Sequence, residues 1–452
     1  MDFLRSHHSS LVTHHSLPSS LTLGTLAHLG ALSALYLGTV PLKWLILIVV
    51  NAVYFFAYFH RVSPAVLAPY MIETFQASAV SLGAMSSAYF YPYAFGQPLV
   101  GFLTDRWGSR KVITLATVIA CGGAILCGFA PTLWIAAVGR GLIGLGAGGV
   151  FVPAIKVLIP WFGPSAMSQM NAILLAVGNL GAITASAPYA WFIQQTGWRF
   201  SFLLIAGITL ILVVLSWTQI HDHPPQDPPL VSPGKKGDSP FFVHFGEILR
   251  SPFFWLTASL FFFYGGPIST FQGLWGYPFL IDVYGYDRLA AANLLMIIAL
   301  GVIFGGPILV WFAEKKFPQN IQRVLSVLLV GQLVIWCLIV FLGFMLNTFA
   351  LGIILFVMGM SHSGALSLFW TVVRKATPPE KLGTMMGLTN PFPFLAIALF
   401  QPFTGYLMDR VGKVGQGFPF AAYQLAFFPC VASAAIAFVI SLTLSGRKKE
   451  WP

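Results

Sequence analysis

The stretch GFLTDRWGSRK at residues 101–111 decides the fold. Only 8% of the chain is charged, yet an Asp, two Arg and a Lys gather here between two long apolar segments. Glycines let two helix ends approach closely, and an Asp at a helix N-terminus can pair with a neighbouring Arg. The stretch therefore predicts a short loop that joins two membrane-spanning helices and closes one side of the protein.

The spacing G-x-x-x-D-R-x-G-x-R-K resembles the loop between helices 2 and 3 of the major facilitator superfamily of membrane transporters. The resemblance covers about residues 44–445. It implies an all-α integral membrane protein of twelve transmembrane helices in two six-helix bundles, with substrate near the midplane between them. The alternative is a basic loop that only sets topology. The resemblance implies gating roles for a group of residues in this loop and for one acid after helix 8: Gly101, Asp105, Arg106, Gly108, Arg110, Lys111 and Glu314.

The composition also indicates a membrane protein. The chain is 57% hydrophobic and its mean hydropathy is +0.81, far above the values of soluble domains. A spanning helix needs roughly 20 apolar residues. The twelve predicted spans are 44–68, 81–102, 112–130, 133–158, 169–193, 200–219, 252–281, 290–312, 323–345, 349–372, 383–407 and 418–444.

The basic residues predict the orientation. With a cytoplasmic N-terminus, 18 of the 24 Lys and Arg residues fall on the cytoplasmic side and four fall outside, which is a strong positive-inside bias. The remaining two, Arg61 and Arg140, lie within spans. Because the basic residues are dispersed over short loops, the net charge of +11 indicates topology and not nucleic-acid binding. We expect a monomer in the bacterial inner membrane, with lipid around it and both termini cytoplasmic.

Five segments follow from this pattern. Residues 1–43 are a tail with two His pairs and an uncharged stretch at 21–40. The His pairs could bind a metal, and the stretch could be a cleaved signal or an extra span, but we favour a disordered or interfacial segment. Residues 44–219 and 251–445 are the two six-helix bundles, 220–250 is a Pro-rich cytoplasmic linker, and 446–452 is a C-terminal tail.

Arg61 is the leading candidate for substrate binding. It lies in YFHRVSPAVLAPY (58–70), well inside the first span, where an ionisable side chain is costly. This segment resembles helix 1 of the organophosphate:phosphate antiporters and the anion:cation symporters, in which that Arg grips an anionic substrate. A guanidinium suits phosphate and carboxylate through forked hydrogen bonds. The alternative is an Arg that snorkels to the headgroups or caps a carbonyl.

Two further cations are candidates. Lys156 precedes Trp161 by five residues, and the glycerol-3-phosphate transporter carries a basic residue at the same offset. An ordinary interfacial Lys is the alternative. Arg140 heads RGLIGLGAGG (140–149), which resembles the superfamily's helix-4 motif of Arg followed by glycines. Arg140 could serve coupling or only satisfy carbonyls.

The differences between this chain and the glycerol-3-phosphate transporter constrain the charge of the substrate. Its second substrate Arg in helix 7 is absent, with Ser269 near that place, and its helix-5 His falls at Gly178. One strong cation fits a monoanion, such as a carboxylate, better than a doubly charged phosphate ester. The predicted substrate-binding residues are Arg61, Lys156, Arg140, Tyr58, Asn179, Gln272 and His362.

Coupling and catalysis are constrained by what the sequence lacks. None of the 13 acids lies in the middle of a predicted span, so His362 is the residue that could carry a proton, although a packing His is the alternative. No Walker loop, catalytic triad or dinucleotide fingerprint appears, so we predict no enzyme activity and no cofactor. The four cysteines fall inside predicted spans without metal-ligand spacing, so no metal site is expected.

The sequence thus predicts a secondary transporter that moves a small organic anion by alternating access, through exchange or facilitated transport. A proton-coupled symporter of a neutral or zwitterionic solute that uses His362 is the first alternative. The alternative from another class is a receptor or assembly protein that has the transporter fold but moves nothing.

Overall fold

The structure is a computed structural model that describes the backbone of residues 21–224 and 245–446, with nearly all side chains from residue 42 onward. The chain divides into two units, 1–45 and 46–452. The predictions for residues 1–20, for 225–244 of the linker and for 447–452 lie outside the described residues. The only strand-like pairing among the described residues is an isolated bridge between Val414 and Gly417.

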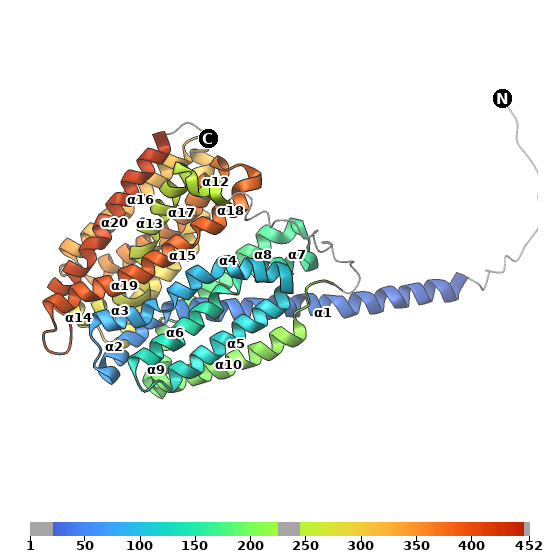
Figure 1. The fold of residues 1–452 in the computed structure, drawn as a ribbon, viewed down its shortest axis with the longest axis horizontal. Helices are drawn as coiled ribbons and strands as arrows, with labels where there is room; N and C mark the ends of the chain where they lie inside the picture. Colours follow the sequence, from blue (N-terminus) through green and yellow to red (C-terminus); the bar gives the residue numbers. More distant parts are fainter. Residues whose placement is uncertain (1–20, 225–244, 447–452) are drawn as a thin grey trace, which may run out of the picture. The chain divides into compact units, whose positions relative to one another are not determined.

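The part of the chain before the linker, here the N-terminal half, is a series of helices that break repeatedly (Figure 1). Pro64 starts α2 directly after α1, because proline is favoured in a first helical turn and cannot continue the previous helix. The helices are α1 (Leu21–Val62), α2 (Pro64–Phe75), α3 (Ala79–Ser87), α4 (Phe90–Trp107), α5 (Ser109–Gly128), α6 (Leu133–Gly148), α7 (Phe151–Phe162), η1 (Pro164–Ala166), α8 (Met167–Thr184), α9 (Ala187–Thr196) and α10 (Trp198–Gln219).

The C-terminal half follows the linker and contains one π-helical turn, η2 (Phe271–Trp275), in the predicted helix 7. Such turns occur mostly inside α-helices and often at functional sites. The other helices are α12 (Phe245–Arg250), α13 (Pro252–Thr270), α14 (Gly276–Tyr284), α15 (Arg288–Lys316), α16 (Ile321–Leu342), α17 (Thr348–Ala376), α18 (Pro379–Thr389), α19 (Pro391–Val411) and α20 (Phe420–Gly446).

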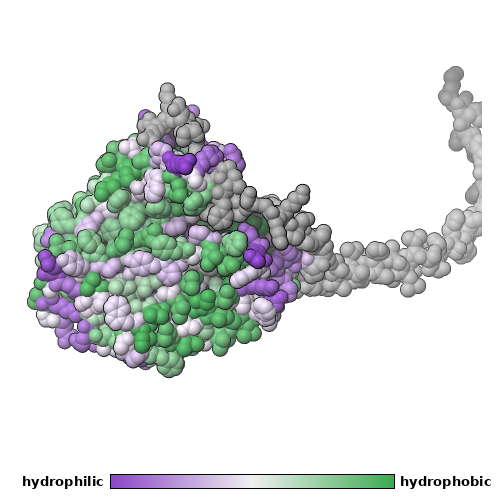
Figure 2. Space-filling model, viewed as in Figure 1, coloured by the Kyte–Doolittle hydropathy of each residue, from purple (hydrophilic) through white to green (hydrophobic). Residues whose placement is uncertain are grey.

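Nine helices among the described residues are long and apolar enough to cross a membrane, or ten if the bent pair α8–α9 is one span. The two other predicted spans, 81–102 and 252–281, are each divided: α3 and α4 form the first, and α13, η2 and α14 the second. Apolar residues cover much of the face in Figure 2, while hydrophilic residues gather towards its ends. The count is compatible with the twelve predicted spans.

The helices end on two opposite sides of the protein, and each side is named here after an acidic residue that lies on it. The Asp105 side holds residues 101–111 and 220–224, and the Asp409 side holds the turns at 76–78, 285–287, 343–347 and 412–419. The two halves pack together through several helix pairs, including α3 with α19 and α2 with α14 (Figure 1). An ion pair joins them on the Asp409 side, where Glu73 Oε1 lies 2.5 Å from Arg288 Nη2. Asn390 donates to Gln97 across the same interface, at 2.6 Å.

Candidate substrate site and gates

Arg61 lies on α1, immediately before the break at Ser63 and Pro64, and its side chain is only partly exposed. Its guanidinium carbon lies 5.4 Å from the ring centre of Tyr58 and 5.0 Å from that of Phe394. Phe394 belongs to α19, so Arg61 sits where the two halves meet. Within the described residues, its guanidinium has no hydrogen bond or ion pair. Its N–H groups are therefore available to an anion.

Aromatic rings form the wall beside Arg61. The ring centres of Tyr54 and Tyr58 are 5.1 Å apart, and Phe151 lies 5.7 Å from Tyr54. A Cβ atom at Gly178 on α8 would lie 2.9 Å from Tyr54 Cε1 and 3.1 Å from Tyr58 Cδ2. The tyrosine rings therefore fill the space that a side chain at position 178 would need, which explains why glycine stands there.

His362 on α17 lies in the same region. Its ring stacks on Tyr264 at 4.9 Å, and the Tyr264 hydroxyl donates to the His362 carbonyl. Its Nδ1 atom is buried and has no hydrogen-bond partner in the part of the chain that the structure describes. Gly265, the residue after Tyr264, packs against Pro393, the neighbour of Phe394, and a Cβ at Gly265 would lie 2.6 Å from Pro393 Cβ. The structure thus brings together Arg61, Tyr58 and His362 in one region between the two halves.

Arg140 supports the break in α1. Only 1% of the residue is exposed, and its Nη1 donates to the His60 carbonyl at 2.6 Å. Pro64 has no N–H, so this carbonyl lacks its normal helical donor four residues on. The guanidinium supplies that donor and also lies 4.9 Å from the Tyr89 ring centre. Of the two predicted roles, this geometry favours the satisfaction of a carbonyl next to Arg61.

Arg140→Leu is expected to destabilise the protein, because it leaves the His60 carbonyl only the longer hydrogen bond from Ser63 Oγ, at 3.4 Å. In a Pro64→Ala background, the new alanine supplies an N–H, so the substitution of Arg140 should cost about 1–2 kcal/mol less. Thermal unfolding of the four purified variants measures this coupling. Equal losses in the two backgrounds would contradict the proposed support of the carbonyl.

Lys156 is placed away from this cluster. Its ammonium pairs with the Asp105 carboxylate, and both residues belong to the N-terminal half. The two side chains are 40% and 65% exposed, which is typical of a solvent-screened pair. In this structure Lys156 therefore pairs with Asp105 and does not stand beside Arg61.

The loop at 101–111 contacts the start of the linker. Gly108 has φ +85° and lies against the Asp222 carboxylate, which also accepts from the Arg110 N–H at 3.0 Å. The Arg110 guanidinium stacks 4.5 Å from the Trp217 ring. A Cβ at Gly101 would meet none of the described atoms within 4 Å, so the described residues do not show the close approach expected at that glycine. The gate candidates Arg106, Lys111 and Glu314 are exposed.

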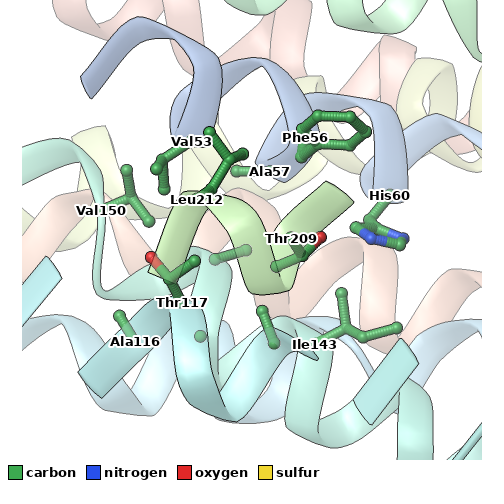
Figure 3. A pocket seen from close by; sticks show the side chains of 13 residues that line it. Val53, Phe56, Ala57, His60, Ala116, Thr117, Ile143, Val150, Thr209 and Leu212 are labelled. Carbon is green, nitrogen blue, oxygen red and sulfur yellow. The ribbon is translucent and has the colours of Figure 1, made fainter. Parts of the chain in front are cut away.

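A separate small cavity lies inside the N-terminal half, between α1, α5, α6 and α10 (Figure 3). Its lining includes Val53, His60, Thr117 and Leu212, and it holds about 20 Å³. That volume suffices for about one water molecule and excludes an organic anion. Among the described residues, no three His, Cys, Asp or Glu side chains lie together in a way that could hold a metal.

The comparison with known proteins identifies the family. The sequence profile of the Major Facilitator Superfamily matches residues 50–392. The chain belongs to the major facilitator superfamily. The probable sulfoacetate transporter of Cupriavidus necator is 26% identical over 82% of this chain and 88% of its own length. The hexuronate transporter of Escherichia coli K12 is 24% identical over 82% and 89%.

A solved structure agrees with the fold. A bacterial homologue of the human lysosomal transporter Spinster, in an inward-facing and occupied conformation, matches with a TM-score of 0.71 at 18% identity, over 91% of this chain and 99% of that one. This major facilitator protein is thus a membrane transporter and not an enzyme, and the two relatives described above are named for organic anions.

Two predicted site residues contribute less clearly to the cluster. The Asn179 amide donates to the Leu175 carbonyl of its own helix at 2.9 Å, and Gln272 lies half-buried in the π turn. Phe394, in contrast, contacts Arg61 but was not among the predicted site residues. The sequence feature that could have indicated Phe394 is the run NPFPF (390–394), whose two prolines break helices and which starts α19 at the interface.

Proposed function

We propose that this transporter moves a small organic monoanion across a bacterial plasma membrane by alternating access, through exchange or facilitated transport. The observation that carries the proposal is Arg61, a guanidinium at the interface of the two halves with no ionic or hydrogen-bonding partner among the described residues. Such a charge is costly inside a membrane protein, and a bound anion would offset the cost. The organic anions named for the relatives support the same class of substrate.

The contacts of the two other candidate cations, Lys156 and Arg140, indicate the charge of the substrate. Lys156 is paired with Asp105, and Arg140 is sealed from solvent and bonded to a carbonyl. One guanidinium therefore remains for the substrate, which favours one negative charge. A carboxylate matches its forked N–H groups.

The direction of opening follows from the orientation. The positive-inside bias of the basic residues supports a cytoplasmic position for the Asp105 side. The ion pair of Glu73 with Arg288 joins the halves on the opposite side, while a Cβ at Gly101 on the Asp105 side would meet no described atom within 4 Å. These contacts support an inward-facing conformation, in which Arg61 is reached from the cytoplasm.

A thermal-shift screen of the purified protein, followed by uptake into proteoliposomes, tests the proposal. The panel contains monocarboxylates, dicarboxylates, sulfonates, phosphate esters and neutral sugars of similar size. We expect stabilisation by monoanions and uptake of the same compounds. Equal shifts with neutral sugars would favour a neutral-solute carrier, and binding without uptake in sealed vesicles would favour a receptor.

A proton-coupled carrier is the second candidate, because the buried Nδ1 atom of His362 has no hydrogen-bond partner among the described residues. A bound proton there would be repelled by Arg61 until an anion arrives. Loading of proton and anion would then be linked.

Asp105→Asn is expected to slow transport about tenfold while leaving insertion and thermal unfolding unchanged, because the lost charge weakens the cytoplasmic closure of the outward-open state. Initial uptake rates in proteoliposomes measure the effect. Glu380→Gln is the matched control, since Glu380 is an exposed acid on the same side. Wild-type rates for Asp105→Asn would mean that the loop only sets topology.

A further inference from the structure

Helices α4 and α19 carry one repeated segment. QPLVGFLTDRWG (97–108) and QPFTGYLMDRVG (401–412) share Gln, Pro, Gly, Leu, Asp, Arg and Gly at the same positions. Both segments end at a glycine with φ 85°, Gly108 with ψ 160° and Gly412 with ψ 170°. The acids of the two copies, Asp105 and Asp409, therefore occupy equivalent places on opposite sides of the membrane.

The two acids are engaged differently in this conformation. Asp105 pairs with Lys156 inside its own half. Asp409 reaches across to the other half, where Oδ1 accepts from the Ala79 N–H at 2.9 Å and Oδ2 from the Val80 N–H at 2.8 Å. One carboxylate thus binds two backbone donors at the start of α3.

These bonds complete the cap of α3. The first four N–H groups of a helix have no partner within it. In α3, Ser81 N donates to the Ser78 side chain at 3.2 Å, while Leu82 N already makes the first helical bond, to the Ser78 carbonyl at 3.0 Å. The N–H groups of Ala79 and Val80 depend on Asp409. A carboxylate here also faces the positive end of the helix dipole.

The backbones beside this contact are as close as glycine permits. A Cβ at Gly405 would collide with the Ala79 carbonyl and lie 2.9 Å from the Val80 nitrogen. A Cβ at Gly83 would collide with the Gln401 carbonyl and lie 2.7 Å from Pro402 Cα. The contact is therefore specific to this arrangement of the halves and must break if they separate on the Asp409 side.

We propose that Asp409 is the gating residue that holds the extracellular side closed, as the counterpart of Asp105 on the cytoplasmic side. This inference rests on the proposed alternating-access function. The bonds from Asp409 to Ala79 and Val80, here called the Asp409 latch, form in the inward-facing state and break when the extracellular side opens. Water then satisfies the two N–H groups, while Asp105 is available to close the opposite side.

Distance measurements between spin labels test the latch without substrate. An unnatural amino acid with a ketone group replaces Gln76 and Val414, which are exposed on opposite halves, and a spin label is attached to each ketone. The distance between the two labels reports the extracellular opening, and the native cysteines stay in place. Asp409→Ala should raise the ratio of open to closed populations about tenfold, as expected for loss of a charged helix cap. Asn347→Ala is the matched control, because Asn347 caps α17 on the same side within one half, at 2.9 Å from Ala350 N, and should leave the ratio unchanged.

Further variants keep the test decisive. Asp409→Asn keeps one acceptor oxygen but loses the charge, so it should give a smaller shift in the same direction. Gly405→Ala should open the extracellular side by steric clash, and it replaces Asp409→Ala if that variant does not fold. Folded variants at 405 and 409 with wild-type distances would overturn the latch. Failure of the wild type to transport any anion, with the shift intact, would overturn only the proposed substrate.

Discussion

Replacing Arg61 with alanine is expected to abolish anion binding, with a loss of affinity of at least about 100-fold. The variant removes the guanidinium at the interface that has no ionic or hydrogen-bonding partner among the described residues. Arg61→Lys should recover little, because an ammonium supplies charge but no planar fork for a carboxylate. Titration of the anion that emerges from the thermal-shift screen, followed by calorimetry, measures both variants.

The control for Arg61 is Arg199→Ala. Arg199 also stacks on an aromatic ring, 4.2 Å from the Trp198 centroid, but it donates to the Ala130 carbonyl away from the site. This variant should bind as wild type does. If Arg61→Ala binds as tightly as wild type, Arg61 has a structural role and the anion proposal loses its main support.

Preloading proteoliposomes with unlabelled substrate is expected to speed the entry of labelled substrate about tenfold. The empty carrier must bury the charge of Arg61 alone when its halves close, whereas the loaded carrier buries a neutral pair. A ligand shifts the conformational equilibrium only through its higher affinity for the occluded state, so return of the empty carrier should limit the rate. Initial rates with and without internal substrate measure this difference.

The decisive comparison for coupling uses His362→Gln across a pH gradient. An exchanger should show the same stimulation by internal substrate in this variant as in wild type. Strong accumulation into empty vesicles, driven by the gradient and lost in His362→Gln, would instead establish proton coupling through that residue.

The sequence predicted the superfamily because its signal is local. The segment at 101–111 and the apolar runs lie within short windows, and the superfamily match and the helices confirm them. The helix breaks were harder to predict, since α3 ends at Ser87 and α4 begins at Phe90 without a proline between them. Tertiary contacts override local propensity at such positions.

The site was predictable only in part, because its contacts join distant residues. Arg61 is conspicuous as a charge inside an apolar span, but the pairing of Lys156 with Asp105 connects residues 51 positions apart. The contact of Arg61 with Phe394 crosses from one half to the other. No spacing rule relates residues at such separations, so partners could be assigned only from coordinates.

Gly101 and Gly405 occupy equivalent positions in the repeated segment, yet only Gly405 is crowded in this conformation. The substitutions that a two-state carrier tolerates therefore depend on the contacts of every conformation in its transport cycle, and not on the contacts of one conformation. A screen that scores the melting of the inward-facing form should find Gly101→Ala nearly silent, while selection for growth on the transported compound should reject it. At such positions, selection acts through contacts that form only in the conformation that the stability assay does not sample.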